Sequence, residues 1–149
     1  MTSEELDRDV RVFVFKHFVE NTRPPSTAET SDALNISAAD SAASFDRLAA
    51  SRAIVLERGT HDIRMANPLS AVPTAFPVAV GGKHYYGNCI WDSMGVVAML
   101  GGTGTIESKC GCCGEPMPLT INKLELEPVE GIVHIGVPAA HWWDDIVYT

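Results

Sequence analysis

The chain has 149 residues, of which 46% are hydrophobic and 20% charged, and a formal net charge of −8. This composition is typical of one globular domain or two small ones, because a disordered chain has too few apolar groups to offset the entropy of ordering. No apolar run approaches the ~20 residues that span a bilayer, and the acidic N-terminus does not resemble a signal peptide. The sequence therefore predicts a cytoplasmic protein without a membrane segment, whose four cysteines serve as thiols rather than disulfides.

The N-terminal region has a helical pattern that ends in a hairpin. Pro24 ends a first helix, and Ser26 with Glu29 forms a capping-box pattern for a second. The expected elements are helices over 4–20, 27–34 and after Ser37, then hairpin strands over 54–56 and 63–65. This order is typical of a winged helix-turn-helix, so we predict a winged-helix-like domain over residues 1–68.

A winged helix suggests DNA binding, but the charges of this region argue against a nucleic-acid partner. Residues 1–68 carry eight basic and eleven acidic side chains, and the expected recognition helix mixes both signs. Phosphate contacts require clustered Lys and Arg. The favoured interpretation is a scaffold or docking module, while Arg58 and Arg64 on the expected wing leave a transcriptional regulator open as the alternative.

Residues 69–149 differ in composition, since they are rich in Gly and Pro and contain all four cysteines and all three tryptophans. Asn88 is the expected N-cap of a helix over 89–100. Turn residues and apolar runs predict short strands over 77–80, 84–86, 103–108, 119–121, 124–127 and 131–137. The sequence therefore predicts an α+β protein, in which a small mixed sheet with one buried helix follows the N-terminal module.

Cys89 and Asp92 are the first candidate site. On a helix they stand at positions i and i+3, so their side chains lie on one face. In the first turn, unpaired backbone N–H groups would lower the pKa of the Cys89 thiol. A thiolate beside a carboxyl group makes a nucleophile or a soft-metal ligand with a general acid. A structural cysteine next to a solvated aspartate fits the spacing at least as well.

The second candidate site is a cluster of three cysteines, Cys110, Cys112 and Cys113, with a C-x-x-C spacing between the first and the last. Flanking glycines would let the backbone fold around a small ion, and soft thiolates prefer zinc, cuprous copper or mercuric ion. A structural zinc site needs four ligands, for which Cys89 or a histidine would complete the set. Structural or incidental thiols are the equally supported alternative.

The sequence HWWDD at 141–145 places two tryptophans next to each other. Adjacent side chains cannot both face the same way, which leaves one free to cover a pocket or an interface. The favoured interpretation is an arrangement with one ring in the core and one on the surface.

Four motifs follow one another in the C-terminal half: YGNCIWD at 86–92, GGT at 101–103, IESKC at 106–110 and GEP at 114–116. In this order and spacing they resemble the alkylmercury (organomercurial) lyase family. The resemblance covers residues 77–138. The family also has a small winged-helix-like domain at its N-terminus, in agreement with the interpretation of residues 1–68.

The resemblance implies cleavage of the carbon–mercury bond of organomercurials. Cys89 would be the first mercury ligand, and Asp92 would deliver a proton to the departing carbon. Cys110 matches a family cysteine that is regarded as structural. The implied partner is a small organometallic compound or soft metal ion, with mercuric ion as the product and no required cofactor; zinc or copper at the cysteine cluster is the alternative.

The family has a second catalytic cysteine nearer the C-terminus, beyond the strand before Pro138. This sequence contains no cysteine after Cys113. We therefore expect either that this thiol lies beyond Thr149 or that this relative lacks it. A further hypothesis is that Cys112 and Cys113 take its place if their loop reaches Cys89.

Three functions remain open from the sequence. An alkylmercury lyase would release R–H in a reaction that requires Asp92. A non-catalytic soft-metal-binding or sensor protein would bind tightly through Cys89 and the 110–113 loop without turnover. A winged-helix regulator would bind DNA in a salt-sensitive manner.

Overall fold

The computed structural model describes residues 2–148. Its helices are α1 (Ser3–Asn21), α2 (Thr27–Leu34), α3 (Ala38–Ala50), α4 (Ile90–Met99) and the 3-10 helix η1 (Ala139–Asp144). Its strands are β1 (Val55–Leu56), β2 (Ile63–Ala66), β3 (Leu69–Ser70), β4 (Pro77–Val80), β5 (Lys83–Tyr86), β6 (Gly104–Ile106), β7 (Leu119–Asn122) and β8 (Glu125–Leu126). Within these residues, no helix combines the length and apolar character needed to cross a membrane.

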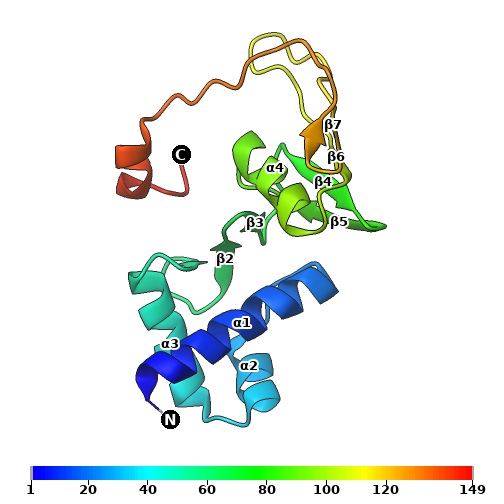
Figure 1. Cartoon of the computed structure of the whole chain (residues 1–149). Coiled ribbons are helices and arrows are strands. Elements are labelled where there is room, and N and C mark those ends of the chain that lie inside the picture. Colours follow the sequence, from blue (N-terminus) through cyan, green and yellow to red (C-terminus); the bar gives the residue numbers. More distant parts are fainter. Residues whose placement is uncertain (1, 149) are drawn as a thin grey trace.

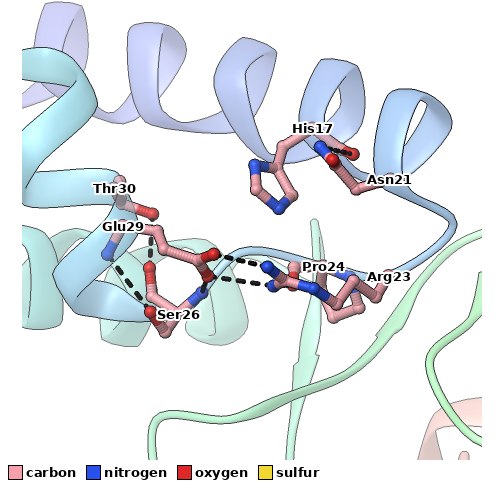
Figure 2. Close-up of polar contacts among 7 residues, drawn as sticks. All are labelled: His17, Asn21, Arg23, Pro24, Ser26, Glu29 and Thr30. Carbon is pink, nitrogen blue, oxygen red and sulfur yellow. Dashed lines mark hydrogen bonds and ion pairs between the residues drawn. The ribbon is translucent and has the colours of Figure 1, made fainter.

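Local hydrogen bonds fix where the second helix begins, as the capping-box pattern predicts. The Ser26 hydroxyl accepts from the Glu29 backbone N–H at 3.1 Å, and the Glu29 carboxylate accepts from the Ser26 N–H at 2.8 Å (Figure 2). Arg23 donates to both oxygens of the same carboxylate. These contacts satisfy N–H groups that have no partner inside the helix, and they stabilise the turn between α1 and α2.

The helices α1, α2 and α3 form one end of the molecule (Figure 1). Their core contains Val10, Val14 and Phe18 of α1 with Phe45 of α3, all almost completely buried. An antiparallel sheet follows, in the order β1-β2-β3. Helices followed by short antiparallel strands are the expected order of elements, whereas the winged-helix description itself stays a prediction.

The other end of the molecule is an antiparallel sheet in the order β5-β4-β6-β7-β8, with α4 packed against it (Figure 1). Val96 and Val97 of α4 are fully buried, as are Val78 of β4 and Ile106 of β6. The sequence of α4 is apolar on most sides of the helix, as expected for a helix that packs into a core. Helices beside antiparallel sheets give the α+β class that the sequence predicts.

The two ends share one hydrophobic core. The Tyr85 hydroxyl donates to the backbone carbonyl of Val19 at 2.7 Å, and Lys83 Nζ donates to the carbonyl of Glu20 at 2.8 Å. The predicted domain boundary after residue 68 falls between β2 and β3, which are hydrogen-bonded to each other. The start of the C-terminal half is therefore held against the N-terminal helices.

The segment after β8 differs from the prediction. A strand was expected over 131–137, but these residues form no strand in the structure. A strand needs a neighbouring strand to satisfy its N–H and C=O groups. The sheet ends at the two-residue strand β8, and the chain instead leads away from it to η1 (orange to red in Figure 1). Ile132 is 93% exposed in consequence.

Candidate thiol site

Cys89 is the N-cap residue of α4, with extended backbone, and its sulfur accepts a hydrogen bond from the Asp92 backbone N–H at 3.5 Å. The prediction that Asn88 caps this helix is therefore wrong by one residue. The Asn88 amide instead donates to Asn67 Oδ1 at 2.9 Å and to the carbonyl of Pro68 at 3.3 Å. These bonds tie the start of α4 to the turn after β2.

Gly87 sets how closely β5 can approach the first turn of α4. A Cβ atom at this position would lie 2.1 Å from Ser93 Oγ and 2.6 Å from the Ser93 backbone nitrogen. Ser93 is completely buried, and its hydroxyl donates to the Cys89 carbonyl at 3.0 Å. A side chain at position 87 would therefore displace the turn that positions the Cys89 thiol.

The structure brings the side chains of Cys89 and Asp92 together, as their spacing predicts. Both are half-buried, and the thiol donates a hydrogen bond to the carboxylate. Burial raises the pKa of the Asp92 carboxyl above its ordinary value, because a desolvated carboxylate is disfavoured.

The pKa of the Cys89 thiol is also raised, so the predicted lowering is wrong. Burial is the main cause, and it outweighs the hydrogen bond from the Asp92 N–H that favours the thiolate. The nearby Asp92 carboxylate adds to the increase by charge repulsion. In the free protein, the pair therefore favours a protonated thiol next to a carboxyl group.

A cavity of about 350 Å³ opens in front of this pair. Its lining is mostly apolar and comes from β2, the start of α4, the 133–137 segment and the C-terminal residues. The lining residues are Met65, Asn67, Asn88, Cys89, Ile90, Trp91, Asp92, Val133, His134, Ile135, Gly136, Val137, Trp142, Trp143, Ile146 and Val147. An apolar cavity with a few converging polar groups is the usual form of a small-molecule site.

Both adjacent tryptophans are half-buried and line this cavity, so the favoured arrangement with one ring in the core and one on the surface is wrong. Neighbouring side chains of the 3-10 helix η1 border the same broad cavity, which the sequence argument had excluded. Trp142 Nε1 donates to the carbonyl of Val137 at 2.7 Å. Arg52 follows α3 by two residues, and its guanidinium lies 5.2 Å from the centre of the Trp143 ring. The aromatic wall is thus held in part by a residue of the N-terminal region.

Sequence reasoning missed several cavity residues, above all Met65 and Asn67 from the hairpin of the N-terminal half. No local motif marks them, because their role depends on contacts between distant segments. The alternating apolar run over 131–137 did carry a signal, but it was interpreted as a strand. In the structure, Val133, Ile135 and Val137 line the cavity instead.

The three remaining cysteines lie on a turn between β6 and β7. The Cys110 N–H donates to the Glu115 carbonyl at 2.8 Å, and the Gly114 N–H donates to the Cys110 carbonyl at 2.9 Å. Hydrogen bonds from the backbone N–H groups of Cys113 and Cys112 to the Cys110 sulfur lower the pKa of the Cys110 thiol. Cys112 and Cys113 themselves are exposed.

The predicted metal ligands were Cys89, Cys110, Cys112 and Cys113. The structure does not bring these four cysteines together into one metal centre. Cys110 and Cys112 line a second cavity, of about 690 Å³, while Cys89 lines the first. The two cavities share Ile90 and two residues of the segment after β8 as common walls. Among residues 2–148, no three His, Cys, Asp or Glu side chains are grouped to hold a metal ion, so zinc or copper is not supported there.

Comparison with known proteins then decides the family. The family model for alkylmercury lyase (MerB) matches residues 69–149. The chain belongs to the alkylmercury lyase family. Curated alkylmercury lyases from Bacillus cereus and Clostridium butyricum are each 33% identical to it in an alignment of 73 residues that covers 47% of this chain. The match spans 34% of the length of these alkylmercury lyases, about a third of each.

A solved structure has a similar fold. The crystal structure of the mercury-bound form of MerB2 matches 81% of this chain and 59% of that chain, with a TM-score of 0.65 and 20% sequence identity. Identity this low shows the fold alone. This match confirms the α+β class, and the family model confirms the resemblance to alkylmercury lyases.

Proposed function

We propose that this protein binds organomercurials at Cys89 and cleaves their carbon–mercury bond with a proton from Asp92. One observation carries the proposal: a thiol and a carboxyl group of raised pKa are hydrogen-bonded to each other at the wall of an apolar cavity. Membership of the alkylmercury lyase family supports the same chemistry.

The first step joins mercury to sulfur. The Cys89 sulfur forms a bond to the mercury of R–Hg⁺, because soft sulfur prefers soft metal ions. The thiol proton passes to the Asp92 carboxylate, which already accepts a hydrogen bond from it. The products of this step are a Cys89–S–Hg–R adduct and a neutral carboxyl group.

The second step breaks the carbon–mercury bond. The Asp92 carboxyl transfers its proton to the carbon, which takes the electron pair of the C–Hg bond and leaves as R–H. Mercury stays bound to Cys89 beside the restored carboxylate. The raised pKa of Asp92 favours this step, because it keeps the proton on the carboxyl group until the carbon accepts it.

The test is to incubate the protein with phenylmercury acetate and to measure released benzene by gas chromatography. We expect benzene from the wild type, a mercury adduct without benzene from Asp92→Asn, and neither at this site from Cys89→Ser. Mass spectrometry of the adduct separates binding from cleavage. Benzene release by Asp92→Asn at the wild-type rate would exclude the proposed role of the carboxyl group.

A second candidate is a soft-metal-binding or sensor protein without turnover. The lining of the first cavity favours this candidate. Among the described residues that line it, Cys89 is the single cysteine, so no second thiol there assists cleavage. The same assay separates the two functions. A lasting phenylmercury adduct on Cys89 of the wild type, without benzene, would favour the sensor.

A further inference from the structure

We infer that Cys110 and Cys113 form a separate two-thiolate site for inorganic Hg(II), on the turn between β6 and β7. This site goes beyond the proposed cleavage and does not depend on it.

The loop is closed at its base by antiparallel hydrogen bonds. The Ser108 hydroxyl donates to the Met117 carbonyl, and the Met117 N–H donates to the Ser108 carbonyl at 2.8 Å. One residue pair further, Lys109 and Pro116 form a β-bridge. These contacts hold the two arms of the loop together, so the cysteines at its tip are presented in one arrangement.

The turn brings the first and last cysteine together. The Cys110 N–H donates to the Glu115 carbonyl at 2.8 Å, and Gly114 turns the chain back with a positive φ of 75°. The Cys113 thiol then lies within hydrogen-bonding reach of the Cys110 sulfur. The N–H groups of Cys112 and Cys113 donate to the same sulfur, so the turn folds back around the Cys110 side chain.

Two thiolates suit mercury better than zinc. A structural zinc ion takes four ligands, usually from two such pairs. Hg(II) is soft and is satisfied by two thiolates, so it does not need the further ligands that zinc requires. The balanced reaction is Hg²⁺ with two thiols, which gives the S–Hg–S unit and two protons released to solvent.

The position of the loop makes the site accessible. Cys113 is exposed, and Cys110 lines the second cavity, which adjoins the Cys89 cavity through Ile90, Val133 and His134. Inorganic mercury would therefore have two different thiol sites in two adjoining cavities of the C-terminal half.

The experiment uses the full chain with Cys89→Ser, which removes the thiol of the first cavity. We titrate it with HgCl₂, follow the ultraviolet charge-transfer band of the Hg–thiolate bond, and count the remaining reactive thiols. The expected result is one bound equivalent with the loss of two reactive thiols. Adding Cys110→Ser or Cys113→Ser should abolish this binding, whereas the matched control Cys112→Ser should retain it.

Two outcomes would overturn the inference. Cys89→Ser that binds no Hg(II) while its circular dichroism spectrum stays native would show that the loop is not a site. Loss of binding in the Cys112 control, with retention in Cys113→Ser, would assign the mercury to a different pair. Neither outcome involves benzene release, so the failure of this inference and of the proposed cleavage are distinguishable.

Discussion

Cys89 and Cys110 lie in the same half of the molecule, but their surroundings shift the pKa of their thiols in opposite directions. Both sulfurs accept hydrogen bonds from backbone N–H groups, which favour the thiolate. Cys89 is also desolvated in an apolar cavity beside the Asp92 carboxylate, whereas the turn residues that follow Cys110 are exposed to solvent. Burial, not the number of N–H donors, therefore decides in which direction the thiol pKa shifts.

This difference separates two kinds of thiol chemistry. A protonated thiol next to a carboxyl group can pass its proton on as sulfur binds mercury, which is what the proposed cleavage at Cys89 needs. At Cys110 the groups that shift the thiol pKa are the neighbouring cysteines rather than a carboxyl group, which suits binding of a soft ion without proton transfer. The comparison thus assigns bond cleavage to the Cys89 region and ion binding to the Cys110 region.

The largest expected effect comes from Asp92→Asn. Loss of a general acid lowers rates by about 10²–10⁴-fold, so benzene release from phenylmercury acetate should fall by that order. Hg(II) binding at the Cys110 loop should not change. Asp32→Asn, on the exposed surface of α2, is the control and should leave both properties intact. Equal losses at both sites would mean that the two regions are not chemically separate.

The second prediction concerns the two glycines near these thiols. Gly87→Ala should destabilise the protein by about 1–3 kcal/mol, because its Cβ would overlap Ser93 and force the start of α4 to move. Gly111→Ala should change stability by less than about 0.5 kcal/mol, since its Cβ would point into open space. Urea denaturation measures both.

Mercury binding should follow the same division between the two glycines. Gly87→Ala should weaken binding at Cys89, and Gly111→Ala should leave Hg(II) binding at Cys110 intact. A stable Gly87→Ala variant with normal phenylmercury binding would contradict the view that this close contact positions the Cys89 thiol.

Local signals in the sequence predicted the features that depend on neighbours along the chain. The capping box of Ser26 and Glu29 was found because both partners lie within one helical turn. The contact between Cys89 and Asp92 was found for the same reason, although the helix cap was misplaced by one residue.

Features that depend on distant segments could not be predicted. The raised pKa of Cys89 comes from burial, and the cavity in front of it is completed by Met65 and Trp143, far away in sequence. The prediction of a strand over 131–137 is wrong for a related reason. An alternating apolar pattern does not show whether a neighbouring strand is present to pair with it. In each case the missing information was a long-range contact.

The third prediction is a pH dependence of thiol modification. A lowered pKa means that the Cys110 thiolate is present at lower pH, so iodoacetamide should modify Cys110 at a pH where an ordinary thiol is still protonated. The raised pKa of Cys89 moves its modification to higher pH. At neutral pH, Cys110 should react several-fold faster than Cys89.

Peptide mass spectrometry resolves the two sites within one sample. Guanidinium-unfolded protein is the control, in which the two rates should become equal because burial and hydrogen bonds are lost. Faster modification of Cys89 in the folded protein would reverse the comparison between the two regions.

The smallest expected effect comes from Arg52→Gln, which removes the guanidinium from the Trp143 ring. A cation–π contact at an exposed site contributes about 0.5–1 kcal/mol, so the aromatic wall should loosen only slightly. We expect phenylmercury affinity at Cys89 to fall by a few-fold and the tryptophan fluorescence to change, with Hg(II) binding at the Cys110 loop unaltered. Arg58→Gln, on the exposed turn between β1 and β2, is the matched control. A change in Hg(II) binding at the loop of Arg52→Gln would mean that the aromatic wall supports both thiol regions, and the two cavities would then have to be treated as one coupled site.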